Sequence, residues 1–341
     1  MLRRSALHGT SARGFLTMPL TWPELPLDSW RDTYATVHMW FQIVGKTRLV
    51  LAPRQNHWWH VAQYVTSRGL TTSAIPIGQR TFTVDFDFLD HALYVTVSDG
   101  GTGTISLEPR TVADFYDEYF TLLDSLGVAV EIWPVPVEVE NAIPFPSDRT
   151  HASYDPGAAT RAWQVLLQAD RVLKSFRGRF IGKASPVHFF WGSFDLAATR
   201  FSGRRAPLHP GGAHNLGNWV MQEAYSHECT SAGFWPGGGS VSEPVFYSYA
   251  YPEPAGYRSY PVEPSAAHYD DTLREFVLPY AAVRTAPSPD DAVLRFLQTT
   301  YSAAADLGQW DRGGLDLPEA EWSSAAVTRE HSAPSFGEKP S

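Results

Sequence analysis

The predicted secondary structure runs through the same order twice. In each half a helix ends at a Gly-Lys pair, several strands follow, and a capped helix closes at Leu-Gly. The residues repeat in part, since IVGK at 43–46 matches FIGK at 180–183 and Val112 matches Val293, 181 positions later. A helix must bury its apolar stripe against a neighbouring layer. The order therefore predicts an α+β fold with two related helix–antiparallel sheet–helix halves in tandem, related by a pseudo-two-fold axis. The alternative is that the similarity between the halves arose by chance, because this order of elements is common among α+β proteins.

The individual elements follow from hydrophobic periodicity and from capping residues. Apolar side chains at helical spacing predict a first helix over 28–44, and Thr111 and Asp155 are the expected N-caps of two later helices. Phenylalanine and valine alternate with polar residues over 81–88, which predicts a half-buried antiparallel strand. Further strands are predicted at 47–52, 57–67, 92–98, 104–108, 128–133, 186–201, 225–235 and 245–251, and further helices at 111–127, 156–180, 219–224 and 288–308.

The chain divides at a proline-rich segment, PVPVEVENAIPFPSD at 134–148. Proline-rich backbone is extended and is typical of linkers. We therefore expect a first half at 19–133, a linker at 134–154 and a second half at 155–316. The two ends, 1–18 and 317–341, are expected to be a disordered lead and a disordered tail.

Charge and cysteine content exclude some classes of protein. Lys and Arg number 27 against 36 Asp and Glu, a formal net charge of −9, which argues against a general nucleic-acid binder. No apolar run reaches the ~18 residues that a membrane span needs. The single cysteine, Cys229, excludes an intrachain disulfide and suits a reducing, cytoplasmic location. We expect neither nucleic acid nor membrane as a partner; the oligomeric state and any cofactor stay open.

Aromatic residues and long loops indicate where a site should lie. The chain has 12 Trp, 15 Tyr and 19 Phe, many of them beside Gly or Pro, and aromatic side chains favour both cores and ligand pockets. The second half is longer than the first, mainly in the loops at 202–217 and 252–288, and long loops on a rigid scaffold often carry function. We expect a cleft between the halves, rimmed by these loops. A stiff aromatic core is the alternative.

His188, His227 and Asp195 are the candidates for catalytic proton transfer. His188 and Asp195 would face opposite sides of a regular strand, but Gly192 between them allows a bulge or a close ligand approach. A carboxylate in so apolar a strand needs a partner. The alternative for Asp195 is therefore a buried pair with a nearby arginine.

The candidates for ligand binding are a basic cluster and several rings. Arg200, Arg204 and Arg205 stand together in an acidic chain, and arginine forks match carboxylates and phosphates. The alternative is that these three arginines lie in a solvated turn and form ion pairs with acidic residues. The rings expected to shape the cleft are Trp59, Trp191, His57 and His60, although the two histidines would face opposite sides of a regular strand and at least one should be structural.

A metal site is a weaker hypothesis. His209, His214, His227 and Glu228 lie within 20 residues and carry ligand types that divalent metals accept. Their spacing matches no compact zinc signature. Cys229 is expected to be a buried apolar residue rather than a nucleophile.

Several long motifs run through the chain: NHWWHV, DFDF, HASYDP, GKASPVHFFWGSFDLAATRFSGRRAP, EAYSHE, GFWPGGG and YAYPEPAG. These motifs resemble the bacterial family catalogued as domain of unknown function 5996, and the resemblance covers about residues 20–315. It implies that 1–18 lie outside the shared region. It implies no activity, cofactor or catalytic residue.

Two functional hypotheses follow. The first is an enzyme that acts on a small anionic molecule in the cleft between the halves. The alternative is a non-catalytic module that binds a small molecule or another protein with the same residues.

Overall fold

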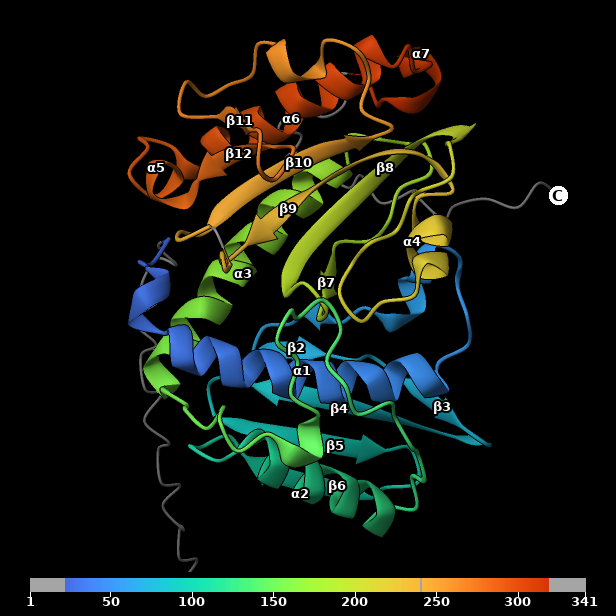
Figure 1. Cartoon of the computed structure of the whole chain (residues 1–341), viewed down its shortest axis with the longest axis vertical. Helices are drawn as coiled ribbons and strands as arrows, with labels where there is room; N and C mark the ends of the chain where they lie inside the picture. The colour runs from blue at the N-terminus through green and yellow to red at the C-terminus, as the bar shows by residue number, and fades with distance from the viewer. Residues whose placement is uncertain (1–21, 240, 319–341) are drawn as a thin grey trace, which may run out of the picture.

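A computed structural model describes residues 22–239 and 241–318 (Figure 1). It contains helices and two antiparallel sheets of six strands each, which confirms the predicted α+β class. None of the described helices is long and apolar enough to cross a membrane. The predicted lead at 1–18 and most of the predicted tail at 317–341 lie outside the described residues.

The first sheet lies between helices α1 (Arg31–Leu51) and α2 (Val112–Ser125) in the chain. Its strands pair in the order β1-β2-β4-β5-β6, and β3 also pairs with β4. The strands are β1 (Tyr64–Val65), β2 (Gly69–Thr71), β3 (Ile75–Ile77), β4 (Arg80–Asp87), β5 (Ala92–Val97) and β6 (Thr102–Ser106), and the short 3-10 helices are η1 (Leu27–Ser29), η2 (Asn56–Val61) and η3 (Phe145–Ser147).

The second sheet follows α3 (Pro156–Arg177) and is followed by α6 (Pro289–Leu307). Its strands pair in the order β11-β12-β10-β9-β8-β7. The remaining elements are β7 (His188–Phe190), β8 (Asp195–Arg205), α4 (Asn218–Ala224), β9 (His227–Trp235), β10 (Val245–Tyr251), η4 (Tyr257–Ser259), β11 (His268–Asp270), β12 (Glu275–Pro279), α5 (Tyr280–Arg284) and α7 (Arg312–Leu315).

The two sheets meet edge to edge. Gln63, just before β1, and Phe189 in β7 exchange both backbone hydrogen bonds, at 2.9 and 2.8 Å. Helix α3 crosses this seam, because Thr160 and Trp163 donate hydrogen bonds to backbone carbonyls of the first half while the rest of the helix packs on β8 and β9. In Figure 1, α1 crosses the front of the first sheet whereas α3 passes behind the second. We call the face of the second sheet opposite α3 its open face.

The core is aromatic and continuous across both halves. Trp40 is fully buried and stacks on Phe115 with ring centroids 4.8 Å apart. Phe41, the next residue of α1, stacks on Phe86 of β4 at 4.1 Å and meets Phe189 of β7 edge to face at 5.3 Å. Stacked and edge-to-face contacts of this kind add to the free energy of burial. Adjacent residues of α1 thus tie together elements of both halves.

Several local predictions are confirmed. The Thr111 hydroxyl accepts a hydrogen bond from the Asp114 N–H, and the Asp155 carboxylate accepts one from the Ala158 N–H, so both residues cap helices as expected. In β4, Phe82, Val84 and Phe86 are buried on one face, as the alternation predicted.

Other predictions were wrong at segment 47–67. The expected strand at 47–52 is instead the end of α1, which continues past Gly45 to Leu51, because a short apolar run is compatible with a helix end as well as with a strand. The expected strand at 57–67 begins as η2, in which His57 and Trp58 have left-handed φ values of 56° and 62°. No strand forms at 128–133.

The segment at 134–154 is irregular, contains η3 and is packed against the fold. Val137, Phe145 and Tyr154 are buried, and the Gln42 side chain hydrogen-bonds both the N–H and the carbonyl of Val137. The segment therefore contributes to the fold beside α1. The domain boundaries and the duplication stay predictions. The similar meander order of the two sheets supports the duplication.

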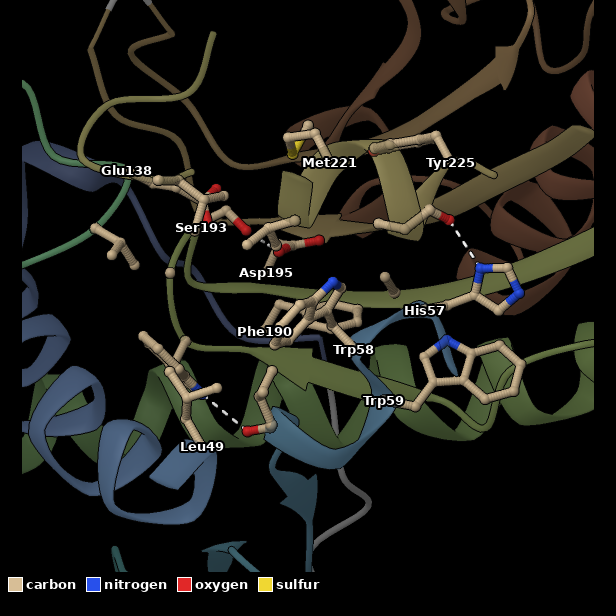
Figure 2. A pocket seen from close by; sticks show the side chains of 18 of the residues that line it. Leu49, His57, Trp58, Trp59, Glu138, Phe190, Ser193, Asp195, Met221 and Tyr225 are labelled. Atoms are coloured by element: carbon tan, nitrogen blue, oxygen red, sulfur yellow. Dashed lines mark hydrogen bonds between the residues drawn. The ribbon is translucent and has the colours of Figure 1, made fainter. Parts of the chain in front are cut away.

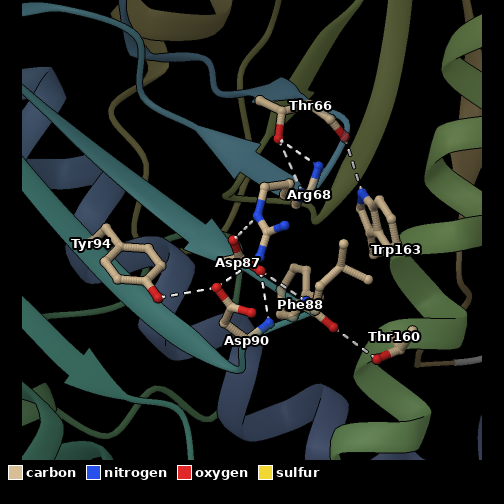
Figure 3. Close-up of polar contacts among 10 residues, drawn as sticks. Thr66, Arg68, Asp87, Phe88, Asp90, Tyr94, Thr160 and Trp163 are labelled. Atoms are coloured by element: carbon tan, nitrogen blue, oxygen red, sulfur yellow. Dashed lines mark hydrogen bonds and ion pairs between the residues drawn. The ribbon is translucent and has the colours of Figure 1, made fainter. Parts of the chain in front are cut away.

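Asp87 is a buried carboxylate on the polar face of β4, opposite to Phe82, Val84 and Phe86 (Figure 3). Its Oδ1 accepts hydrogen bonds from the N–H groups of Leu89 and Asp90, each at 2.9 Å, and its Oδ2 pairs with Arg68. Burial alone would raise the pKa of Asp87, but Arg68 and the two N–H groups hold it below its ordinary value.

We expect Asp87→Ala to lower the free energy of unfolding by about 3 kcal/mol at neutral pH, mainly because two backbone N–H groups lose their acceptor. Because the folded pKa is depressed, this contribution is present above the unfolded pKa of ~3.9 and is lost as the pH falls. Urea unfolding at pH 7 and pH 3 tests this. The difference between the parent and the variant should shrink at pH 3, and an unchanged difference would contradict the role of the carboxylate.

Candidate functional site

A cavity of about 400 Å³ lies on the open face of the second sheet and is lined by both halves (Figure 2). Its floor is formed by β8, β9 and β10. Its walls come from the C-terminal end of α1, from η2, from the segment at 133–138 and from the segment at 215–225 that includes α4. The predicted rim of loop 202–217 is present only in part.

Aromatic rings form most of the walls. Trp58 of η2 packs against Trp219 of α4 with ring centroids 5.1 Å apart, so these two elements close one side of the cavity. The other lining rings are Trp59, Trp133, Phe190, Trp191, Phe201, Tyr225, Tyr247 and Tyr249. A mostly apolar cavity with a few polar groups is typical of a small-molecule site.

Carboxyl and hydroxyl groups gather at one end of the cavity. We call Glu138, Ser193, Asp195 and Tyr247 the acidic end; Figure 2 shows the first three close together. Ser193 and Tyr247 each donate a hydrogen bond to the Asp195 carboxylate, which is 7% exposed. Burial raises the pKa of Asp195.

Glu138 and Asp195 both line the cavity, but Asp195 is buried whereas Glu138 is accessible from the cavity, although protein atoms surround it there. Burial, and secondarily the nearby Asp195 charge, raise the pKa of Glu138 to about 7. Its carboxyl lies against the backbone of Gly192, where an added Cβ would be 2.2 Å from Oε1.

Basic groups lie beside the cavity at His57. We call His57, Lys183, His227 and Arg205 the basic end; of these four, His57 lines the cavity, and Lys183 and His227 contact His57. The His57 Nδ1 lies 2.9 Å from the Ala224 carbonyl, so Nδ1 carries the proton and Nε2 accepts from Lys183 Nζ at 2.6 Å. The His227 ring lies 5.8 Å from His57, and Arg205 faces His227 across the β8–β9 pair.

The pKa values at the basic end favour neutral imidazoles. Burial is the main cause that lowers the pKa of His57, with the Lys183 charge acting in the same direction. Burial likewise lowers the pKa of His227, together with Lys183 and Arg205. The cationic charge of this end therefore comes from Lys183 and Arg205.

The two ends lie far apart along β8. Asp195 and Phe201 face the cavity from the same strand, six residues apart, which corresponds to ~20 Å. The Phe201 ring is 4.5 Å from His57, so it marks the basic end. Figure 2 shows Asp195 and His57 well apart in the cavity. The carboxyl groups and His57 therefore lie at different ends of it.

The structure places some of the predicted site residues at the cavity. His57, Trp59, Trp191 and Asp195 line it, and His227 lies at its basic end. Asp195 has hydroxyl partners rather than the arginine partner considered as the alternative.

Two predicted histidines lie outside the cavity lining. His60 is buried, and its Nδ1 accepts a hydrogen bond from the Gln55 N–H. His188 is 1% exposed, its ring contacts Trp59, Tyr64 and Phe190, and neither ring nitrogen has a hydrogen-bond partner among the described residues. Burial lowers the pKa of His188 to about 3. Its position does not support the predicted proton transfer.

The predicted arginine clamp does not form in this cavity. Arg200 lies on the opposite face of β8 from Asp195, because side chains five residues apart on a strand point to opposite sides. It is 2% exposed, and its guanidinium carbon lies 3.5 Å from the Phe176 ring centroid. Arg204 pairs with Glu228 at 2.6 Å. Of the three arginines, only Arg205 stands at the basic end.

The predicted metal ligands are dispersed. The His209 ring stacks on Tyr225 at 4.7 Å, the backbone carbonyl of His214 accepts from the Glu138 N–H, and Glu228 is occupied by Arg204. Residues 22–239 and 241–318 contain no group of three or more His, Cys, Asp or Glu side chains arranged for a metal ion. Cys229 is buried, as expected, and burial raises its pKa to about 12.

Sequence reasoning missed Glu138, Lys46 and Tyr247. Glu138 stands in the segment interpreted as a linker, and Tyr247 is one of several tyrosines in an alternating strand. Lys46 and Lys183 belong to the repeated Gly-Lys pairs, which were noted only as marks of duplication. The repeated Gly-Lys pair is the sequence signal that could have indicated Lys46 and Lys183.

Comparison with known proteins gives a family but no function. The family model described as "Family of unknown function (DUF5996)" matches residues 22–317. No curated protein and no solved structure matches the chain. Since the family model covers most of the sequence, this chain belongs to the DUF5996 family.

Proposed function

We propose that this protein is an enzyme that binds a small, elongated organic molecule with a flat apolar body and an anionic end, and that the acidic end of the cavity exchanges protons with it. The observation that supports the proposal is one aromatic cavity with carboxyl groups at one end and, next to its lining residue His57, the cationic groups of Lys183 and Arg205. Such a cavity selects a ligand by its length as well as by its charge.

The basic end suits an anionic group. Lys183 has three N–H donors and gives one to His57, which leaves two for a ligand. Arg205 is exposed and makes no side-chain hydrogen bond or ion pair with any described residue. Carboxylate and phosphate oxygens match both kinds of donor.

The acidic end suits general acid–base chemistry. With a pKa raised to about 7, the Glu138 carboxyl exists in both protonation states near neutral pH, which is the condition for an efficient proton donor or acceptor. Asp195 is held in place by Ser193 and Tyr247. Two carboxyls in different environments are a common basis for separate acid and base roles.

The binding step is tested with 1-anilinonaphthalene-8-sulfonate, a flat aromatic anion whose fluorescence rises in apolar sites. We expect saturable binding at one site, weakened about tenfold by Lys183→Met, which corresponds to the loss of about 1.4 kcal/mol. The matched control is Lys174→Met, because Lys174 pairs with Asp170 on α3, whereas Lys183 contacts the lining residue His57. Equal effects of the two variants, or no saturable binding, would contradict the proposed anion site.

The natural ligand is sought by mass spectrometry of small molecules released from the purified protein. An anionic molecule of matching length supports the proposal. If that molecule is returned unchanged after incubation with fresh protein and solvent isotope (D2O) leaves no label in it, the proton-exchange step is wrong and the protein is a binding module.

A further inference from the structure

Lys46 is a buried lysine without an acidic partner. It lies in the last two turns of α1 and is 2% exposed, yet it contributes to the cavity lining. Its ammonium lies 4.9 Å from the Trp133 ring centroid and 5.8 Å from that of Trp191. Within residues 22–239 and 241–318, its side chain has no hydrogen bond or ion pair.

Such an environment disfavours the charged form of an amine. Two indole faces attract a cation, but they replace only a small part of the hydration that burial removes. Burial accordingly lowers the pKa of Lys46 to about 8. At neutral pH a lysine of this kind has far more free amine than an exposed lysine with an ordinary pKa of ~10.4.

Lys46 and Glu138 line the same cavity. Gln42 lies one helical turn earlier on the same face of α1, and it clamps the backbone of Val137 at 2.8 and 2.9 Å. Glu138 follows Val137 and faces the cavity. A free amine and a carboxyl that changes protonation near neutral pH therefore line one cavity, and the segment that carries the carboxyl is fixed to the helix that carries the amine.

The close approach of Trp191 depends on the glycine before this lysine. A Cβ on Gly45 would lie 2.3 Å from the Trp191 ring, so only glycine lets the indole lie against α1 at this point. The repeated Gly-Lys pair at 45–46 thus has a physical role in the first half, because its glycine admits the ring that covers its lysine.

We propose that Lys46 is a nucleophile that forms an imine with an aldehyde or ketone group of the molecule bound in the cavity. The free amine nitrogen attacks the carbonyl carbon, and proton transfer gives a neutral carbinolamine. Protonated Glu138 then donates a proton to the carbinolamine hydroxyl, which leaves as water, and the nitrogen forms the double bond to carbon. Water reverses the sequence. This inference rests on the proposed function for the ligand site and narrows its substrate class to carbonyl compounds.

The test uses 4-carboxybenzaldehyde, a flat aromatic aldehyde with an anionic end, together with sodium cyanoborohydride to reduce any imine to a stable secondary amine. The chain has four lysines, at positions 46, 174, 183 and 339, so peptide mass spectrometry assigns each product directly. We expect Lys46 in the folded protein to be modified at least tenfold faster than Lys174 at pH 7.5, with a rate that rises through a midpoint of about pH 8.

Two variants make the result decisive. Lys46→Met keeps the length and apolar character of the stem and must abolish the modification at this position, while its thermal unfolding shows whether the fold is intact. Glu138→Gln should slow imine formation at Lys46 about tenfold, because the proton donor is lost. Modification of Lys46 no faster than that of Lys174 in the folded parent overturns the proposal.

The outcome separates this proposal from the preceding one. If the sulfonate dye binds and depends on Lys183 while Lys46 stays unmodified, the anion site stands and the nucleophile is wrong. If Lys46 is rapidly modified while the dye does not bind, the amine is reactive and the anion site is wrong.

Discussion

Gly45→Ala is expected to lower the free energy of unfolding by about 2 kcal/mol, although alanine favours a helix over glycine by about 1 kcal/mol. The added Cβ would lie 2.3 Å from Cδ1 and Nε1 of Trp191. The indole is 5% exposed and donates a hydrogen bond from Nε1 to the Val61 carbonyl at 2.8 Å, so it cannot move without losing that bond. Urea unfolding measures the loss.

The matched control for this substitution is Gly178→Ala. Gly178 ends α3 with right-handed φ and ψ of −64° and −15°, and an added Cβ would meet neighbouring atoms only at ordinary contact distances of 3.5 Å. We expect this control to change stability by less than about 0.5 kcal/mol. Equal effects of the two substitutions would show that the contact of Trp191 with α1 does not hold the two halves together.

His188→Leu is expected to make the protein more resistant to acid. Burial, together with the nearby Arg48 charge, holds the pKa of His188 at about 3, whereas the unfolded chain has a histidine pKa of ~6.5. Between these values the unfolded state binds a proton that the folded state does not, so stability falls as the pH decreases from about 6.5 toward 3. At pH 5 the penalty is about 2 kcal/mol, the product of ~1.5 pH units and 1.36 kcal/mol per unit.

Leucine at position 188 removes this loss of stability at low pH. It also removes two buried ring nitrogens that have no hydrogen-bond partner among the described residues. We expect the variant to match or exceed the parent in stability at pH 7 and to exceed it by about 2 kcal/mol at pH 5, as measured by urea unfolding. His227→Leu is the control, because the half-buried His227 ring lies at the cavity edge and bonds the Ser226 hydroxyl. If the parent and the His188→Leu variant lose the same stability between pH 7 and pH 5, the inference that His188 is a buried neutral imidazole is contradicted.

Much of the local structure followed from sequence patterns. Thr111 and Asp155 were placed correctly as caps because a cap depends on a side chain and the backbone three residues later. The alternation in 81–88 was read correctly because one face of β4 is buried against helices. The segment at 47–52 was read incorrectly, since a short apolar run has the same composition in a buried helix end and in a strand.

The site was predictable only in outline. The expected cleft between the halves corresponds to a cavity lined by both, and Trp59, Trp191, His57 and Asp195, which the sequence indicates as site residues, line it. The arginines were misplaced because the sequence order of Arg200 and Asp195 does not show which face of β8 turns toward α3. Lys46 was missed because nothing local distinguishes a buried lysine from an exposed one on an amphipathic helix.

By itself, the sequence determined the α+β class, the caps and most strand positions, because these depend on residues within a few positions of one another. Only the tertiary structure decided which charged side chains line the cavity and which lie on the opposite face of the second sheet. That choice depends on the open face of the second sheet and on Trp191 lying against Gly45, a contact between residues 146 positions apart in the chain. Burial then changes the chemistry of Lys46, Glu138 and His188, since desolvation depends on surrounding atoms rather than on neighbours in sequence.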